Sequence, residues 1–407
     1  MTPVAISDFT VVSALGAGRA PTLAALQASR SGLAPQFFET ARLNTWLGMV
    51  PGLDADAAWT QVFAPGSELA AYDCRNNRLA ALALQADGFG LRVQAAAQRH
   101  GAQRVGVFLG TSTAGILQTE VAYRHRDPTT GALPASLHYG QTHNTYSVAR
   151  FVREALGLQG PAHVVSTACS SSAKVFATAA RMLAAGVVDA AVVGGVDSLC
   201  MTTLYGFKSL ELLSPDICRP WDAGRNGLSI GEAAAFALLE RRERQDGETP
   251  PPAGWLLGAG ESSDGHHMSS PHPEGAGAAA AMRAALAQAG LQAADVDYLN
   301  LHGTGTPGND AAEDLAVCSV FGTALPCSST KGFTGHTLGA AGGVEAAFAL
   351  LALQHGFMPA GLNVQTPDPT RRAAYLGAAR AQPLRVVASN SFGFGGSNCC
   401  LLFGAAQ

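Results

Sequence analysis

Short apolar runs of strand character alternate along the chain with longer, alanine-rich stretches of helical character. The clearest strand-like runs are RVGVFLGTST (104–113), DAAVVGGVDS (189–198), VDYLNLHGTGT (296–306) and LRVVASNSFGFGG (384–396). Strands that alternate with helices are typical of proteins in which helices pack on a mostly parallel sheet. The pattern therefore predicts the α/β class.

One segment has the composition of a linker. RRERQDGETPPPAG (Arg241–Gly254) is first charged and then proline-rich, and it predicts two unequal halves, residues 1–250 and 251–407. Three motifs of the first half recur in the same order in the second. They are LGTST (109–113) with HGTGT (302–306), STAC (166–169) with STK (329–331), and GGVDS (194–198) with FGGSN (394–398). We interpret the halves as copies of one duplicated α/β unit, with chance as the alternative explanation of three short matches.

Composition restricts the class of protein further. The chain has 407 residues, 47% of them hydrophobic and 14% charged, which indicates a well-buried globular protein. Its 47 glycines exceed the roughly 28 of average usage and indicate many tight turns. The net charge of -4 leaves no broad basic field for nucleic acid.

Neither a membrane span nor a signal peptide is expected. Apolar runs are broken before they reach the ~20 residues of a span, and the first residues lack a basic region. The eight cysteines are scattered and show no metal-ligand spacing. They are expected to be free thiols, which indicates the cytosol, and no metal site is predicted.

Cys169 stands where a predicted strand passes into a predicted helix, in VVSTACSSSAKVFATAARMLAAG (164–186). A helix N-terminus presents unpaired N–H groups and a positive dipole end, which favour a thiolate and could hold an oxyanion. The alternative is an inert buried thiol. The other seven cysteines carry no such signal, and the adjacent Cys399 and Cys400 are expected to pack in the core.

Three further segments could carry chemistry. His302 follows a strand and opens a loop with hydroxyls at Thr304 and Thr306, although a lone histidine is usually structural. Lys331 is one of only three lysines and is followed by His336 and, on a predicted helix, Glu345. A Lys–Glu pair could orient a site, and the alternative is a capped helix with a solvated charge.

The last of these segments is NSFGFGGSN (390–398), which combines three glycines with two phenylalanines. This composition suggests a flexible backbone that bears an aromatic side chain. An ordinary glycine-rich turn is the alternative.

Together these segments resemble a known family. TACSSSA (167–173), HGTGTPGND (302–310), STKGFTGHTLGAAGGVEA (329–346) and NSFGFGGSN (390–398) closely resemble the β-ketoacyl-acyl-carrier-protein synthases, of the elongating type with a Cys-His-His site. VVSALG (11–16), HHMSSP (266–271) and CRPWDAGRNGLSIGEAA (218–234) extend the resemblance over nearly the full chain. It implies the thiolase fold, a duplicated α/β unit in five α-β-α-β-α layers, and usually a homodimer.

The resemblance also implies roles for individual residues. Cys169 would be the nucleophile that takes the acyl chain, while His302 and His336 would polarise the malonyl thioester and support loss of carbon dioxide. Lys331 and Glu345 would hold that pocket together. Phe394 would be a mobile gate whose backbone N–H joins that of Cys169 in an oxyanion hole. Substrate contacts are expected from Thr304, Thr306 and Ser269, which match positions along the pantetheine arm, and from Phe207 and Leu228 in the acyl pocket. Thr113 matches a position from which the partner subunit lines that pocket.

The implied reaction is a decarboxylative Claisen condensation that yields a β-ketoacyl-acyl-carrier protein. No cofactor is expected, and the implied partners are acyl carrier protein and a second copy or a homologous subunit. A thiolase-type acyltransferase is one alternative, because Cys399 and Cys400 could supply its second cysteine. A non-catalytic chain-length partner subunit is the other, although such subunits lack the nucleophile.

Several positions depart from primary fatty acid elongases. Ser170-Ser171-Ser172 after the cysteine is more similar to polyketide-type synthases. LYGFKSLELLSPDICRPWD (204–222) is similar to synthases of aryl-polyene and xanthomonadin-type pigment pathways. Because acyl carrier proteins are acidic and this chain is acidic too, docking requires a local basic patch. We expect that patch at Arg75, Arg78, Arg124 and Arg126.

Overall fold

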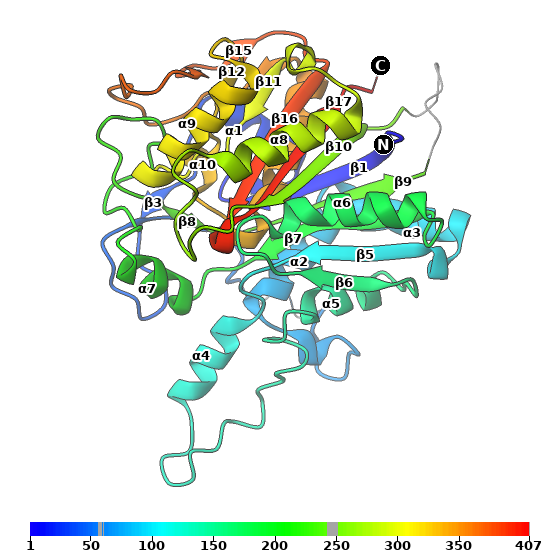
Figure 1. Cartoon of the computed structure of the whole chain (residues 1–407). Helices are drawn as coiled ribbons and strands as arrows, with labels where there is room; N and C mark the ends of the chain where they lie inside the picture. Colours follow the sequence, from blue (N-terminus) through cyan, green and yellow to red (C-terminus); the bar gives the residue numbers. More distant parts are fainter. Residues whose placement is uncertain (56–58, 60, 242–250, 407) are drawn as a thin grey trace.

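The computed structural model describes residues 1–55, 59, 61–241 and 251–406 (Figure 1). Most of the predicted linker Arg241–Gly254, and with it the predicted boundary at residue 250, lies outside the described residues. The predicted α/β class is confirmed, because long strands alternate with helices on both sides of that segment.

The first half contributes the following helices and strands: β1 (Val4–Ser13), β2 (Gly16–Ala17), α1 (Arg19–Gln27), β3 (Ala34–Pro35), β4 (Trp46–Gly48), α2 (Arg75–Gln85), α3 (Phe89–His100), β5 (Val105–Gly110), α4 (Ile116–Arg124), α5 (Ser147–Ala155), β6 (Ala162–Val165), α6 (Ser171–Ala184), β7 (Ala190–Asp197), α7 (Met201–Ser209), β8 (Ile230–Gly231) and β9 (Ala233–Glu240).

The second half contributes these: β10 (Gly254–Ser263), α8 (Ala276–Ala289), β11 (Tyr298–Asn300), α9 (Pro307–Phe321), β12 (Pro326–Ser328), α10 (Lys331–Thr334), the short 3-10 helix η6 (Leu338–Ala340), α11 (Ala341–His355), β13 (Phe357–Met358), β14 (Ala374–Tyr375), β15 (Arg380–Ala381), β16 (Val386–Gly393), the 3-10 turn η7 (Phe394–Gly396) and β17 (Ser397–Gly404).

The strand order shows that the two halves share one topology. In the first half the order is β1-β9-β7-β5-β6, and in the second it is β10-β17-β16-β11-β12. Numbered along each half, both orders are 1-5-4-2-3, with the same alternation of antiparallel and parallel pairs. LGTST and HGTGT stand at the ends of the equivalent strands β5 and β11, and STAC and STK follow β6 and β12. The third pair is offset, because GGVDS covers the end of β7 and FGGSN follows the end of β16. The predicted duplication is therefore confirmed.

Helices separate the two half-sheets and cover their outer faces. α6 and α11 lie in the middle and contact strands of both half-sheets, namely β5, β7 and β9 on one side and β10, β16 and β17 on the other. α2, α3 and α5 cover the outer face of the first half-sheet, and α8 covers that of the second (Figure 1). These are the five layers of the thiolase fold. The half-sheets meet edge to edge where Val4–Ile6 of β1 pairs with β10.

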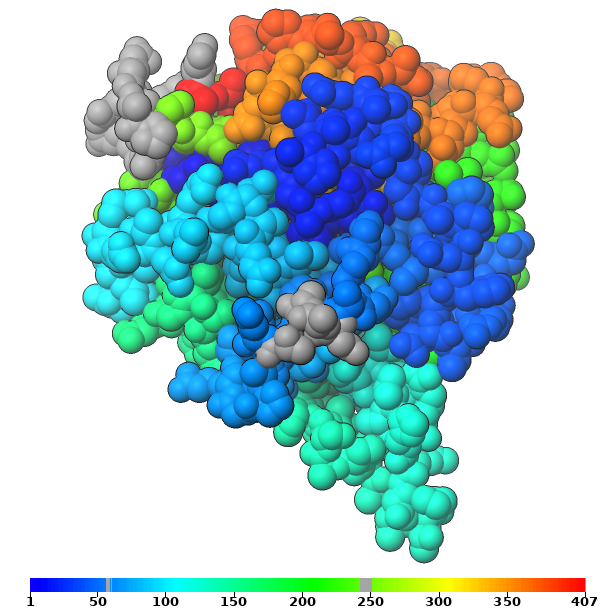
Figure 2. All heavy atoms as spheres, turned by 180° about the vertical axis from the view of Figure 1, so that it is seen from behind, coloured from blue at the N-terminus to red at the C-terminus, as the bar shows by residue number. Residues whose placement is uncertain are grey.

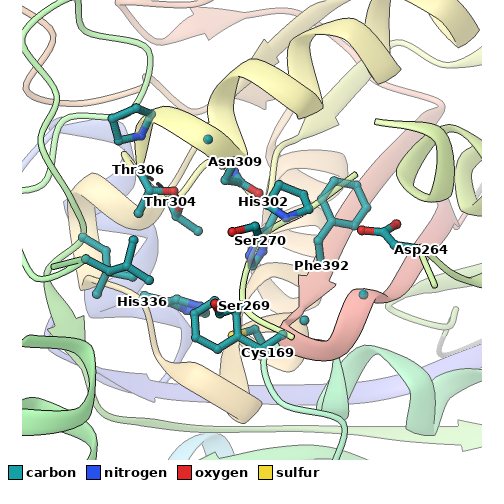
Figure 3. A pocket seen from close by; sticks show the side chains of 18 of the residues that line it. Cys169, Asp264, Ser269, Ser270, His302, Thr304, Thr306, Asn309, His336 and Phe392 are labelled. Carbon is teal, nitrogen blue, oxygen red and sulfur yellow. Dashed lines mark hydrogen bonds between the residues drawn. The ribbon is translucent and has the colours of Figure 1, made fainter. Parts of the chain in front are cut away.

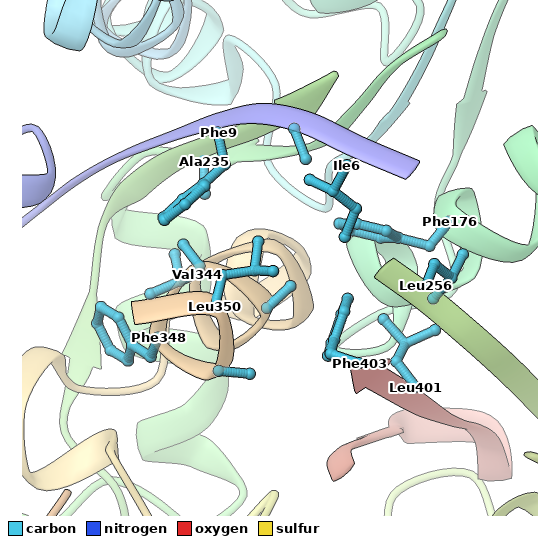
Figure 4. Packing of buried hydrophobic residues seen from close by; sticks show 14 of the residues in the cluster. Ile6, Phe9, Phe176, Ala235, Leu256, Val344, Phe348, Leu350, Leu401 and Phe403 are labelled. Carbon is cyan, nitrogen blue, oxygen red and sulfur yellow. The ribbon is translucent and has the colours of Figure 1, made fainter. Parts of the chain in front are cut away.

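Side-chain alternation along the strands gives each layer its own core. In β17, Cys399, Leu401 and Phe403 face the middle helices, while Cys400 and Leu402 face α8. Figure 4 shows side chains of β1, β9, β10 and β17 around Phe176 of α6 and Phe348 of α11. Successive side chains of a strand point to opposite faces of the sheet, and here both faces are buried. Cys399 and Cys400 are core residues, as expected.

One helix has the length and apolarity of a membrane span. The stretch Leu338–His355, which is η6 followed by α11, is the one such candidate within the described ranges. It is 89% buried inside the protein, between the two half-sheets. Its apolarity is therefore that of a core helix.

A part of the first half projects from this layered body. α4 and the loop that follows it, residues 125–146, form an arm that extends away from the sheets (Figures 1 and 2). Tyr123 and Tyr139 on this arm have more than half of their surface exposed. The edge strand β6, the last in the sheet order, lies on the same side of the molecule.

Gly260 of β10 provides a test of the packing between the second half-sheet and α8. A Cβ atom there would lie 2.0 Å from the Ala281 carbonyl oxygen and 2.3 Å from the Ala285 nitrogen, both backbone atoms of α8. Gly260→Ala should therefore lower the free energy of unfolding by about 1–3 kcal/mol or more, the cost of overpacking. Urea unfolding followed by circular dichroism measures it. Gly206→Ala is the control, because nothing lies within 4 Å of its Cβ position in α7. An unchanged midpoint in the Gly260 variant would contradict this packing.

Candidate active site

Cys169 lies on a strained turn between β6 and α6. The preceding residue, Ala168, has a φ angle of 53°, which residues other than glycine rarely adopt. The Ser171 hydroxyl donates a hydrogen bond to the Ala168 carbonyl, 2.5 Å away, and accepts one from the Thr167 N–H at 2.9 Å. Strand, turn and helix start thus fix the direction of the thiol, as the sequence predicts.

A cavity of about 330 Å³ opens onto this thiol (Figure 3). Residues from both halves of the chain line it. Those that the sequence predicts at the site are Cys169, Phe207, Leu228, Ser269, His302, Thr304, Thr306, His336 and Phe394. The structure therefore brings together motifs that are up to 225 residues apart in the sequence, the separation of Cys169 and Phe394.

Lys331 lies directly behind His302. Its ammonium group donates hydrogen bonds to the His302 carbonyl oxygen and to Glu345 Oε1 at 2.5 Å, and it lies 3.4 Å from His302 Nδ1. All three side chains are buried. The expected Lys–Glu pair is thus present as a buried ion pair, and the alternative of a solvated charge on a capped helix is wrong.

This contact determines which nitrogen of His302 carries the proton. An ammonium group has donors only, so His302 Nδ1 accepts from Lys331 and the proton of the neutral ring sits on Nε2. Burial and the Lys331 charge hold the pKa of His302 well below its usual range, and the same two causes lower the pKa of His336. Both rings are therefore neutral hydrogen-bonding groups at neutral pH.

The two histidine rings lie edge to face at the cavity. Their centroids are 5.3 Å apart and the rings are inclined by 83°. The backbone N–H of His336 donates to the Ser229 carbonyl at 2.7 Å, which holds the segment after α10 against the end of the first half. Nδ1 of His336 is buried and has no hydrogen-bond partner among the described residues.

Burial dominates the electrostatics of Cys169. It raises the pKa of the thiol to about 12, while the Lys331 ammonium, the Phe394 N–H and the residue's own N–H lower it by less. The N–H groups beside the thiol thus favour the thiolate, as expected, but burial outweighs them in the resting protein. The thiol is only 5% exposed, and a local dipole does not offset that loss of water.

Aromatic and hydroxyl groups form the wall between the thiol and solvent. Phe207 of α7 and Phe394 of η7 lie with centroids 5.5 Å apart and ring planes inclined by 33°, so the expected gate has an aromatic partner in the other half. The Thr304 and Thr306 hydroxyls lie 2.8 Å apart and face the cavity, as does Ser269 on the opposite loop (Figure 3).

Thr113 is the expected substrate-binding residue that the structure does not bring to the cavity. Its hydroxyl donates to Asp197 Oδ1 at 2.9 Å and accepts from the Ser198 N–H at 3.1 Å. The side chain is buried beside the end of β7. Both hydrogen bonds are tertiary contacts, so sequence reasoning about side-chain size could not anticipate them.

Several cavity or support residues were missed by the sequence analysis. Phe392 lines the cavity with its ring centroid 5.6 Å from that of His302. Glu313 of α9 accepts the His302 N–H at 2.8 Å and the Gly303 N–H at 2.7 Å, and Asn390 donates to the same carboxylate. Asp264, also at the cavity, accepts from Asn398 at 2.7 Å. Helical or strand position alone does not reveal such orientations.

The groups around the cavity are suited to acyl transfer. Among the described residues, no group of three or more His, Cys, Asp or Glu side chains is arranged to hold a metal. A thiol, two backbone N–H groups beside it and two neutral imidazoles instead share one largely apolar cavity. Such a set can form a thioester on sulfur and stabilise negative charge on oxygen. The fold and the site define a thiolase-fold condensing enzyme.

Comparisons with known proteins define the family. The family model described as the N-terminal domain of β-ketoacyl synthase matches residues 77–245, and that of the C-terminal domain matches residues 253–365. The chain belongs to the β-ketoacyl synthase family.

Relatives and solved structures agree with this assignment. The 3-oxoacyl-(acyl-carrier-protein) synthase 2 of Vibrio cholerae is 30% identical over 98% of each chain. The mitochondrial 3-oxoacyl-(acyl-carrier-protein) synthase of Arabidopsis thaliana is 42% identical over 61% of this chain, which spans 57% of that relative. The structure of the ketosynthase ApeO in complex with its chain length factor ApeC from Xenorhabdus doucetiae superposes with a TM-score of 0.86 at 36% identity, covering 99% of this chain and 98% of that one.

Alkylation of Cys169 tests the electrostatic description of the thiol. Because the thiolate is the reactive form, the rate with iodoacetamide should rise about tenfold per pH unit up to about pH 10 without a plateau. Lys331→Met removes a charge that lowers the pKa, so alkylation should be slower at each pH. Peptide mass spectrometry follows the modification, and the unfolded chain is the control, with a plateau near the ordinary thiol pKa of ~8.5. A plateau in the folded protein below about pH 8 would show that the helix start outweighs burial.

Proposed function

We propose that this chain catalyses the decarboxylative condensation of an acyl group carried on Cys169 with malonyl-acyl-carrier protein, to give a β-ketoacyl-acyl-carrier protein. The observation that carries the proposal is the arrangement of Cys169, His302 and His336 around one cavity, with Lys331 behind His302. Membership of the β-ketoacyl synthase family supports the reaction class.

In the first half-reaction the Cys169 sulfur attacks the carbonyl carbon of an acyl thioester. The new C–S bond forms, the bond to the carrier sulfur breaks, and the thiol proton leaves with the carrier thiol. The N–H groups of Cys169 and Phe394 point toward the sulfur, where they can stabilise the tetrahedral oxyanion. Exclusion of water by the aromatic gate protects the resulting thioester from hydrolysis.

In the second half-reaction the malonyl thioester loses carbon dioxide. The electron pair of the broken C–C bond moves onto the thioester oxygen as an enolate, beside His302 and His336. The Nε2–H of His302 is a neutral donor for this oxygen, since Lys331 occupies Nδ1. The carbanion then attacks the acyl-cysteine, a C–C bond forms, and Cys169 is released.

The positions of the other cysteines disfavour a thiolase. A thiolase requires a second catalytic cysteine, and the sequence offers Cys399 and Cys400 near the expected place. Both are fully buried in β17 with their side chains in cores, and neither lines the cavity. A non-catalytic chain-length subunit is disfavoured by the nucleophile itself, which lies at the cavity.

The pathway we favour is specialised chain building of the aryl-polyene or polyketide type. Support comes from the segment 204–222, which places Phe207 and Leu212 at the cavity, and from the 36% identity to a structure described as a ketosynthase with its chain length factor. Leu228 is small for its place in the acyl wall, which would admit long or flat unsaturated chains. We also propose that the protein acts in the cytoplasm.

We also propose that the active form is a dimer, with a second copy or a homologous subunit. β6 ends the sheet order on one side, with His163 exposed and Val164 and Val165 half-buried. An unpaired edge of this kind is a template for another strand. The projecting arm of residues 116–146, with its exposed tyrosines, lies on the same side and would reach the partner.

The acyl carrier protein remains the proposed substrate carrier, but the docking patch needs correction. Arg75 is 7% exposed and binds the Glu232 carboxylate with two nitrogens at 2.7 Å, so it cannot belong to a surface patch. Arg78 binds Asp73 with two hydrogen bonds. Arg124, which pairs loosely with Glu39 at 3.4 Å, and Arg126 are accessible. We retain these two as the docking residues.

Acylation and decarboxylation can be measured separately to test the function. Incubation with acyl-carrier protein should add one acyl mass to the wild-type chain and none to Cys169→Ala. Cys400→Ala is the matched control and should still be acylated, because this thiol is remote from the cavity. An acyl adduct on the Cys169 variant would refute its role.

The histidines should matter most in the second step of the same experiment. His302→Ala and His336→Ala should each slow conversion of malonyl-carrier to acetyl-carrier by on the order of 10²–10³, the effect of one lost oxyanion donor. Acylation of Cys169 should fall less. Equal losses in both steps would mean that the histidines act chiefly on the thiol.

The docking residues are tested by charge reversal. Arg124→Glu with Arg126→Glu should raise KM for the acyl-carrier, because the carrier is acidic, and leave KM for a small acyl–pantetheine thioester unchanged. Exposed charges are screened beyond ~10 Å at 0.1 M salt, so the wild-type KM for the carrier should rise with salt. Arg283→Glu on α8 is the control, because it reverses the charge of an arginine outside the proposed docking residues. Normal carrier kinetics in the double variant would move docking to another surface.

A further inference from the structure

Asp197, at the end of β7, is a buried carboxylate that the reaction above does not use. It belongs to the GGVDS motif and has no exposed surface. It does not line the cavity, so it does not touch substrate. Nevertheless it receives hydrogen bonds from segments of both halves of the chain.

The donors come from two places. After β5, Asp197 accepts from the Thr111 hydroxyl at 2.7 Å, from the N–H groups of Ser112 and Thr113 at 2.8 and 2.9 Å, and from the Thr113 hydroxyl. From the second half it accepts the N–H of Gly339, in η6. The carboxylate thus joins the loop after β5 to the segment that follows His336.

Three strained backbone residues surround this carboxylate. Ala114, Ala168 and Leu338 have φ angles of 42°, 53° and 52°. Residues other than glycine keep such angles only where the surrounding contacts determine them. Each of the three is held by the Asp197 network. The Ala114 N–H donates to the Thr111 hydroxyl at 3.0 Å, the Ser112 hydroxyl donates to the Ala168 carbonyl at 3.3 Å, and Leu338 precedes Gly339.

These strained residues adjoin the reacting groups. Ala168 immediately precedes the nucleophile Cys169, and Leu338 lies two residues after His336. The second half has a comparable arrangement, in which Glu313 accepts the N–H groups of His302 and Gly303. In each half, therefore, a buried carboxylate fixes the loop after the equivalent strand, β5 or β11.

We propose that Asp197 is a positioning residue that holds the turn bearing Cys169 and the segment bearing His336 in one relative geometry. It thereby sets the distance between the acyl-cysteine and the carbanion formed beside His336. This inference rests on the proposed function, because it concerns the alignment of the two half-reactions. Small errors in such alignment are costly, since a displacement of about 1 Å can lower a rate by about 10².

Asp197→Asn is the principal test. The amide keeps the size of the side chain but turns an NH₂ group toward N–H donors, so the network must open. Both half-reactions should slow by on the order of tenfold to a hundredfold, with KM for the carriers within about twofold. Ser112→Ala removes only the bond to Ala168, so acylation should fall by about fivefold, as for one hydrogen bond, and decarboxylation should not change.

The pH profile of Cys169 alkylation provides a readout that does not require turnover. The charged or titratable groups around this thiol are Lys331, His302, His336 and Asp197. The Asp197 charge raises the pKa of Cys169, so its removal should move the profile to lower pH. A buried carboxylate remote from the thiol would not move it.

Asp8→Asn is the control, because Asp8 is a buried carboxylate of β1 that pairs with Arg19 and Arg92 away from the cavity. It should lower stability without changing either half-reaction. If Asp197→Asn behaves like Asp8→Asn, with unchanged half-reactions per folded protein and an unshifted alkylation profile, the inference is overturned. Equal loss of both half-reactions in Ser112→Ala would also overturn it. Failure of the wild-type chain to acylate or decarboxylate would instead overturn the proposed function.

Discussion

The buried ammonium group of Lys331 connects the parts of the site more than any other group. A charge removed from water is costly unless it is paired and hydrogen-bonded, and here Glu345 supplies the counter-charge while the His302 carbonyl supplies an acceptor. The pair joins α10, α11 and the loop after β11. Burial and the Lys331 charge together hold the pKa of both histidines low, and the ammonium group also selects the tautomer of His302. One interaction thus fixes the relative positions of these segments and contributes to the protonation states of the two histidines.

The duplicated topology determines where that interaction can lie. In each half the parallel strands β5 and β7, or β11 and β16, end on the same side of the sheet, and loops at such ends are where α/β proteins build sites. The middle helices α6 and α11 begin at these ends, one after Cys169 and one after His336. Because the halves face each other across this helical layer, the nucleophile of one half meets the histidines of the other.

How far the sequence predicts the site depends on the kind of contact. Cys169, His302, His336, Lys331 and Glu345 lie in motifs whose local structure the sequence specifies, and the fold brings them together as expected. Arg75 was misplaced because it is held by a carboxylate, Glu232, that is distant in sequence. Thr113, whose hydroxyl is held by Asp197, does not line the cavity of its own chain, and its expected place in a partner's acyl pocket stays a prediction. For Cys169 the local N–H groups favour the thiolate as expected, but burial, which the sequence does not show, outweighs them. Glu313 and Asp264 were missed because their orientation follows from packing alone.

The place of β1 has a consequence for the kinetics of folding. β1 pairs locally with β2, but its long pairings are with β9 and β10, more than 220 residues later in the chain. Contacts of such high sequence separation form slowly, because a long loop must close before any pairing energy is gained. Val4–Ser13 is also largely apolar, and apart from Val12 and Ser13, which pair with β2, it lacks its sheet partners until β9 has been synthesised. A chain with this order of pairing is exposed to aggregation during synthesis and is a natural client for chaperones.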